Sequence, residues 1–168
     1  MKLTYRVERG KRIDGALTMA FIHNGEYQLT PISIYQDGKV ECSGLVSFEH
    51  FKQKVRSGII VTQPPKGAKI TVGALADFKA ASDAAYPIEP EEFIKEVSDI
   101  IERLNGRPTA SQICWEAWER FERCPSEDNR DALRGAYEAI AKHKRSFVLG
   151  DLNSKDWPIC QAIYGYLQ

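Results

Sequence analysis

Two turn signals in the first third of the chain most constrain its fold. Asn24-Gly25 and Asp37-Gly38 each stand beside runs that are rich in apolar and β-branched residues. Such dipeptides favour type I′ turns, because both central residues of that turn need positive φ angles. The spacing of the two turns therefore predicts an antiparallel β-meander over residues 16–43.

A helix and further strands extend the predicted meander. Ser47 is a suitable N-cap, and the apolar residues after it recur at spacings of three and four, which predicts a helix over residues 47–57. Short β-rich runs follow at residues 59–62 and 70–75. We therefore expect residues 1–76 to form one β module that contains a single short helix.

The second half of the chain has helical periodicity. Three apolar stripes are separated by short loops. Pro90 suits the first turn of the first helix, Thr109 or Ser111 is the expected cap of the second, and Ser126 that of the third. Helices joined by short loops pack antiparallel by default. The pattern therefore predicts an antiparallel helical domain over residues 90–168.

The segments around these helices are less regular. Residues 77–89 are small or polar and read as a linker, either a loop or a short helix. The apolar tail from residue 154 to residue 168 suits a helix or a strand. Strands followed by helices indicate an α+β fold, an N-terminal antiparallel β-meander with one short helix followed by a C-terminal antiparallel helical subdomain.

The charge balance narrows the functional classes. Lysine and arginine together number 23, and so do aspartate and glutamate, so the formal net charge is zero. A dedicated nucleic-acid binder needs a basic excess, so we do not expect nucleic acid as a partner. The sequence has no apolar run of about 20 residues and no secretory signal at its start. We expect a soluble cytoplasmic protein that does not contact membranes, with its oligomeric state left open.

The cysteines indicate neither a metal site nor a disulfide framework. The chain has four cysteines: Cys42, Cys114, Cys124 and Cys160. They form no C-x-x-C pair, and none has a histidine at the sequence spacing typical of metal ligands. We expect four reduced thiols, mostly buried, and we assign no metal and no cofactor.

One polar stretch could carry chemistry. Between residues 142 and 157, basic and acidic side chains flank a short apolar run that we read as a strand. An imidazole and a carboxylate could act as acid and base, while a guanidinium holds an anion. The catalytic candidates are His143, Arg145, Asp151 and Asp156. The alternative is structural, because basic residues suit a helix C-terminus and Gly150-Asp151 suits a turn.

Aromatic residues supply candidate binding positions. Tryptophan and tyrosine are enriched at the energetic centres of protein interfaces. The binding candidates are Trp115, Trp118, Lys155, Trp157 and Tyr164. At a spacing of three on an amphipathic helix, Trp115 and Trp118 are also suited to the core and its edge.

Short motifs in both halves are similar to those of a known family. The first half has Ile22-His23-Asn24-Gly25, Tyr35-x-Asp37-Gly38, Val55-x-Ser57-Gly58 and Pro65-x-Gly67-Ala68-x-Ile70; the second has His143-x-Arg145, Val148-Leu149-Gly150-Asp151, Lys155-Asp156-x-Pro158-Ile159 and Ile163-Tyr164-Gly165. They resemble an uncharacterised bacterial and phage family, in which a β module precedes a helical domain. The family has no assigned activity, so the resemblance implies an architecture and candidate positions. Its members often carry aspartate at the position of Asn153, and a metal site built on paired carboxylates would be weakened here.

Three functional hypotheses follow. The first is a protein-binding or regulatory module, such as an inhibitor or immunity-type protein of a bacterial or phage conflict system. The second is an enzyme or small-ligand binder that acts on an anionic, nucleotide-like or phosphorylated substrate through residues 143–156. The third is a structural subunit of a larger assembly. We favour the first, with another protein as the partner, because the sequence shows no complete catalytic constellation.

Overall fold

The structure is a computed structural model that describes residues 1–84, 87–150 and 156–165. The chain divides into two compact units, Met1–Asn105 and Gly106–Gln168. Each unit has its own core of buried apolar residues, and each is described by itself below. The α+β class and the order of strands before helices are confirmed.

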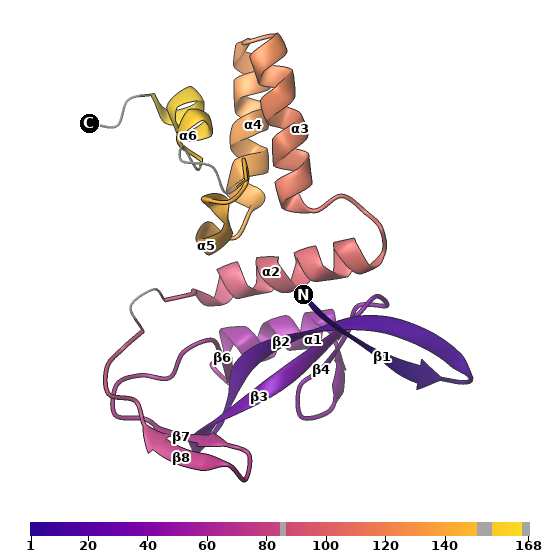
Figure 1. The fold of residues 1–168 in the computed structure, drawn as a ribbon, viewed down its shortest axis with the longest axis vertical. Helices are drawn as coiled ribbons and strands as arrows, with labels where there is room; N and C mark the ends of the chain where they lie inside the picture. The colour runs from indigo at the N-terminus through magenta and orange to yellow at the C-terminus, as the bar shows by residue number, and fades with distance from the viewer. Residues whose placement is uncertain (85–86, 151–155, 166–168) are drawn as a thin grey trace. The chain divides into compact units, whose positions relative to one another are not determined.

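The strands that the structure describes in the first unit form a single sheet (Figure 1). Strands β1 to β5 follow one another as antiparallel neighbours, which confirms the predicted meander. A short β6 adds to the free side of β2, and β7 joins β3 in a parallel pairing that carries β8 at its outer edge. The bounds are β1 (Lys2–Glu8), β2 (Lys11–Asn24), β3 (Glu26–Tyr35), β4 (Lys39–Glu41), β5 (Leu45–Ser47), β6 (Ile60–Val61), β7 (Lys69–Val72) and β8 (Ala76–Lys79).

Both predicted turns exist, but with a different conformation from the one expected. Only the glycines, Gly25 and Gly38, take positive φ angles, of 78° and 77°. The Gly38 N–H donates to the Tyr35 carbonyl at 3.0 Å, as in hairpin loops that end on a left-handed glycine. The two-residue turn with positive φ at both positions is instead Arg9-Gly10, between β1 and β2.

Strand β1 was not predicted from the sequence. Its seven residues pair with β2 from Lys2↔Leu17 to Glu8↔Lys11, so β2 begins well before the predicted meander. A turn made by Arg9-Gly10 has no Asn-Gly or Asp-Gly signature, so the sequence gives no strong hairpin signal between β1 and β2. The alternation of apolar and polar residues in Lys2–Glu8 was the available signal.

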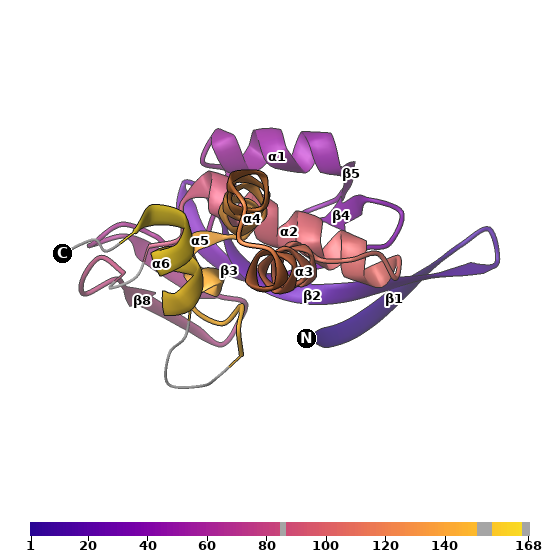
Figure 2. The ribbon, with the colours of Figure 1, turned by 90° about the horizontal axis from the view of Figure 1, so that it is seen from above.

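Two helices of the first unit lie on one face of the sheet (Figures 1 and 2). Helix α1 (Phe48–Arg56) confirms the predicted helix, and the Ser47 hydroxyl accepts a hydrogen bond from the His50 N–H as an N-cap. Helix α2 (Pro90–Leu104) contacts α1, β2 and β3. Their apolar faces and the sheet form the first core: Ala20, Ile32, Ile34, Val40, Cys42, Phe51, Val55, Ile60, Phe93, Ile94, Val97 and Ile101.

The division of the chain differs from the predicted one. Helix α2 belongs to the sheet unit, not to the helical domain that we expected to begin at residue 90. Helix α2 packs against elements of its own unit, and its packing against the helices of the second unit stays a prediction. The periodicity shows that α2 buries one face, but it does not show which partner covers that face. The predicted linker over residues 77–89 also contains part of β8, which pairs with β7.

The second unit is helical. It contains α3 (Ala110–Arg123), α4 (Glu127–Ala139), α5 (Lys142–Arg145) and α6 (Trp157–Tyr164). Thr109 and Gln112 form a capping box at the start of α3, and Ser126 caps α4, as predicted. The tail, predicted as helix or strand, is helical in its described part. The second core contains Cys114, Ala117, Leu133, Tyr137, Ile140, Val148, Ile159 and Ile163.

The stretch after α4 also differs from the prediction. Ile140 takes an extended conformation, so the basic residues 142–145 form a separate short helix and not the end of α4. The apolar run Phe147–Leu149, expected as a strand, is a turn. Within the described residues, none of the helices has the length and apolar character needed to cross a bilayer.

Candidate functional site

Side chains from the polar stretch over residues 142–157 come together around one tyrosine of the second unit. The sequence analysis did not name this tyrosine as a site residue. The Tyr137 hydroxyl, on α4, donates a short hydrogen bond to the Asp156 carboxylate, just before α6. The Cys160 sulfur lies 3.2 Å from the same hydroxyl oxygen. The Arg145 guanidinium, on α5, lies over the Tyr137 ring, with Cζ 5.0 Å from the ring centroid. Two of the four catalytic candidates, Arg145 and Asp156, are thus brought together by Tyr137.

The electrostatics of this cluster favour a neutral tyrosine. Burial raises the pKa of Tyr137, and its hydrogen bond to the Asp156 carboxylate raises it further. The hydroxyl therefore acts as a hydrogen-bond donor at neutral pH and not as a base. Asp156 stands at the N-cap position of α6 but makes no capping hydrogen bond there, because its carboxylate is directed to Tyr137.

Arg145 directs its donors toward the end of α4. Its Nε donates to the Ile140 carbonyl at 3.0 Å, and Nη2 donates to the Glu138 carbonyl at 2.9 Å. These are carbonyls that a helix C-terminus leaves without intrahelical partners. Arg145 therefore links α4 to α5 by its own hydrogen bonds. His143 is half-buried on the same short helix, and Asp151 lies outside the described residues.

The aromatic binding candidates differ in how far their side chains are exposed to solvent. Trp115, Trp157 and Tyr164 are exposed, whereas Trp118 is half-buried against the second core. The Trp115 indole N–H donates to Glu119 at 3.1 Å, and the Tyr164 hydroxyl donates to Glu138 at 3.1 Å. Lys155 lies outside the described residues. The three exposed rings remain available for contacts through their apolar parts.

The first unit has an apolar surface that the sequence analysis did not identify. Successive side chains of a strand point to opposite faces, and Ala20, Ile32 and Ile34 point to the helices. The alternate positions of β2 and β3 therefore point away from the helices. In register they are Leu17↔Ser33, Met19↔Pro31 and Phe21↔Leu29. We call these six residues the open sheet face.

This surface is unusually apolar for a sheet face that no helix of its own unit covers. Met19 is 53% exposed, Pro31 is exposed, and Leu17, Phe21 and Leu29 are half-buried. None of these residues belongs to either core cluster. Antiparallel sheets with one solvated face commonly place polar residues there. A contiguous apolar patch on a sheet typically marks an interaction surface.

An aromatic stack borders one end of the open sheet face. His23 and Tyr27 are cross-strand partners next to the Phe21↔Leu29 pair. Their rings are parallel within 1° and their centroids are 4.3 Å apart. Stacked rings at a hairpin end stiffen the two strands there.

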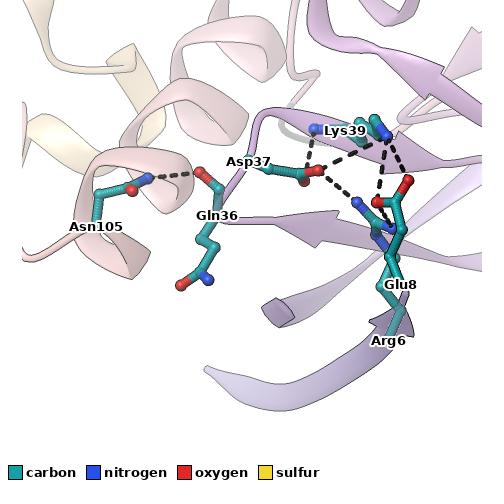
Figure 3. A network of polar contacts seen from close by, with 6 residues as sticks. All are labelled: Arg6, Glu8, Gln36, Asp37, Lys39 and Asn105. Carbon is teal, nitrogen blue, oxygen red and sulfur yellow. Dashed lines mark hydrogen bonds and ion pairs between the residues drawn. The ribbon is translucent and has the colours of Figure 1, made fainter. Parts of the chain in front are cut away.

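A polar network holds the other end of the sheet (Figure 3). Arg6 on β1 donates to Glu8 at 2.6 Å and makes a short ion pair with Asp37 in the β3–β4 turn. Lys39 contacts the Glu8 carboxylate at 3.3 Å. The Asn105 amide, at the end of α2, donates to the Gln36 carbonyl at 2.7 Å. The turn thus connects the edge strand to a helix of the same unit.

Comparison with known families agrees with this division of the chain. A family described as a domain of unknown function, DUF7638, matches residues 3–108. The chain belongs to the DUF7638 family. A second domain of unknown function, DUF7639, matches residues 109–166. The limits of the DUF7638 match include α2, as the first structural unit does. No curated protein and no solved structure matches the chain.

The family match supports part of the resemblance noted from the motifs. Two domain families of unknown function together match residues 3–166, which is consistent with an uncharacterised family. The DUF7638 unit carries the open sheet face, and the DUF7639 segment carries the cluster around Tyr137. In the parts of the chain that the structure describes, no three histidine, cysteine or acidic side chains gather as a metal-binding group.

Proposed function

We propose that this DUF7638 protein is a protein-binding or regulatory module, and that it contacts its partner through the open sheet face. The observation that carries the proposal is the row of apolar side chains at Leu17, Met19, Phe21 and Leu29, on the face opposite the helices. Burying apolar area is the main favourable contribution to protein association. A sheet also presents that area on a backbone that is already ordered, which lowers the ordering cost of binding.

The charge balance supports a protein partner over the other macromolecules. Equal numbers of acidic and basic residues give no overall attraction to phosphates or to anionic lipid surfaces. The finer role that we propose is that of an inhibitor or immunity-type regulator in a bacterial or phage conflict system, acting in the cytoplasm. This finer role rests on the motif resemblance and on the composition.

The enzyme alternative has one specific observation in its favour. Arg145 and Asp156 meet at Tyr137, close to Cys160, in a part of the second unit where the sequence placed a site. Against it, the hydrogen bonds of Arg145 and Asp156 go to groups of the protein itself. We therefore rank it second. A phosphate-dependent rise in thermal stability that Arg145→Lys abolishes would revive it.

The test of the first proposal compares two exposed apolar residues. Met19→Glu places a charge in the open sheet face, whereas Leu75→Glu places one in the exposed turn before β8, where Leu75 is 88% exposed. Wild type and both variants serve as bait in extracts of the organism that encodes the chain. We expect a partner that wild type and Leu75→Glu retain and that Met19→Glu binds at least about tenfold more weakly.

Two results would oppose this proposal. One is a partner that binds Met19→Glu and wild type equally well. The other is a partner lost on Trp157→Ala, which would place the interface on α6 of the second unit. Circular dichroism of each variant shows that the fold is retained, so a loss of binding reports on the surface.

A further inference from the structure

Strand β1 is an edge strand with an apolar stripe. Among the described residues, β1 pairs with β2 alone, so its second edge carries backbone groups that no neighbouring strand uses. Leu3, Tyr5 and Val7 point to one face and are 70%, 57% and 64% exposed. Natural proteins usually protect such edges with charged side chains, proline, bulges or short length, and of these β1 has only the charges of Lys2, Arg6 and Glu8. The segment Lys2–Glu8 has seven residues and contains no proline or glycine.

The sequence of β1 is complementary to itself. If two copies run antiparallel with Tyr5 opposite Tyr5, Leu3 lies opposite Val7 and Lys2 lies opposite Glu8. Each pairing except Tyr5 with Tyr5, which lies on the axis, occurs twice, because the arrangement is two-fold symmetric. Opposite charges directly across a strand pair stabilise it, and apolar pairs on one face do so as well. All seven residues find a partner in this register.

The neighbouring registers are unfavourable. A shift by one pairing step toward the start of the strand places Lys2 opposite Arg6, and the opposite shift places Arg6 opposite Arg6. Like charges directly across a strand pair are destabilising. Registers between these would put the apolar stripes of the two copies on opposite faces of the joined sheet. The charges of β1 therefore select one register.

Ion pairs within the same chain also hold β1 in position. The side chains of Arg6 and Glu8 are fixed by Asp37 and Lys39 of the β3–β4 region (Figure 3). The Glu8 side chain is still 43% exposed, and a carboxylate has room for a further donor. Its hydrogen bond from Arg6 lowers the pKa of Glu8, so it is ionised at neutral pH.

We propose that β1 binds a second copy of this chain, antiparallel and centred on Tyr5, so that two sheets join into one continuous sheet. This surface is distinct from the open sheet face, and the proposal does not depend on the proposed function. A two-fold axis perpendicular to the joined sheet leaves the open sheet faces of both copies on the same side. The dimer would therefore present two binding surfaces together.

Disulfide trapping tests the register directly. In a Cys124→Ser background, which removes the exposed native thiol, Tyr5→Cys places two thiols across the axis. Opposite Cα atoms of antiparallel strands are about 4.5–5.5 Å apart, within the range that a disulfide spans. Leu3→Cys is the matched control, because two copies of Leu3 would lie about 14 Å apart along the strand direction at ~3.4 Å per residue.

We expect Tyr5→Cys to form a covalent dimer under mild oxidation, and Leu3→Cys to form one only when it is mixed with Val7→Cys. Light scattering of the wild type should show a dimer that Lys2→Glu weakens by about tenfold. The proposal is overturned if Leu3→Cys alone is trapped as fast as Tyr5→Cys. It is also overturned if the wild type remains monomeric at every concentration.

Discussion

The close approach of the Tyr35 ring requires a glycine at position 15 of the sheet. The Tyr35 ring lies against this glycine of β2, and Arg6 lies over the same ring, with Cζ 5.0 Å from the centroid. A Cβ at position 15 would lie 2.7 Å from Tyr35 Cδ1 and 2.8 Å from the Ile34 carbonyl oxygen. Glycine is therefore required here by close approach, while the backbone angles are ordinary.

We predict that Gly15→Ala lowers the free energy of unfolding by about 1–3 kcal/mol, because the ring and the backbone must move. Gly135→Ala is the control. Gly135 lies inside α4 with open space around it, so alanine there should stabilise the protein by about 0.5–1 kcal/mol. Urea denaturation measures both values. Equal effects of the two substitutions would contradict the close contact at Gly15.

Tyr137 should make the stability fall at alkaline pH. Its pKa is raised in the folded chain, whereas a tyrosine in the unfolded chain ionises near pH ~10. The unfolded state therefore loses its proton first, and the stability contributed by the neutral hydroxyl is complete below about pH 10 and falls above it. We predict that Tyr137→Phe unfolds with a weaker pH dependence than wild type above this value.

The control for that experiment is Tyr27→Phe, which removes the hydroxyl of a half-buried tyrosine in the other unit. Tyr27→Phe should keep the wild-type pH dependence. Thermal melts at successive alkaline pH values give the comparison. If Tyr137→Phe loses stability with pH as steeply as wild type, the buried hydroxyl is not the cause.

The four thiols should differ in reactivity. Cys124 is exposed, whereas burial raises the pKa of Cys114 to about 11, so little of its reactive thiolate exists at neutral pH. We predict that iodoacetamide modifies Cys124 first in the native protein and modifies Cys114 only after unfolding. Peptide mapping by mass spectrometry checks the order. Early modification of Cys114 would contradict its burial.

The candidate site was predicted only in part, because a tyrosine suits both an apolar core and a polar cluster. Arg145 and Asp156 were identified because basic and acidic side chains alternate on either side of a short apolar run. Tyr137 falls on the apolar stripe of its helix by its spacing, and its ring does lie in the second core. The same side chain has a polar end, and sequence alone does not show whether that end meets a carboxylate. Its contact with Asp156 depends on how α6 packs against α4.

At the scale of elements, strong local signals were the reliable ones. The Ser47 and Ser126 caps and the turns at Asn24-Gly25 and Asp37-Gly38 all occur where the sequence places them. These signals act within a few residues and need no knowledge of the fold. Strand β1 and the location of α2 were missed, because each depends on a partner distant from the local signal.

The place of α2 gives a prediction at this scale. Its residues Phe93, Val97 and Ile101 cover the core side of the sheet, and Asn105 connects its end to Gln36. A fragment of residues 1–105 should unfold cooperatively, whereas a fragment of residues 1–89 should not fold, because its sheet lacks that cover. Chemical denaturation followed by circular dichroism distinguishes the two. Equal cooperativity of both fragments would contradict the assignment of α2 to the first unit.

The open sheet face could not be predicted because it appears only when strand register is known. Leu17, Met19 and Phe21 look like core residues in the sequence, as alternating apolar residues of a strand usually are. The structure places the core on the other face of β2, at Ala16 and Ala20. A shift of one residue in register would exchange the two faces.

At the scale of the whole molecule, we propose that the DUF7638 unit alone carries the binding surface. We therefore expect residues 1–105 to retain the binding activity and residues 106–168 to lack it. The charge-neutral composition and the two cores are compatible with a module that holds a partner through one unit.

The most direct measurement is the affinity of the captured partner for three proteins: the full chain, the fragment of residues 1–105, and the full chain with Met19→Glu. We predict nearly equal dissociation constants for the full chain and the fragment, and a dissociation constant at least about tenfold higher for Met19→Glu. A partner that binds residues 106–168 alone, or that binds Met19→Glu as tightly as wild type, would contradict the assignment of binding to the open sheet face.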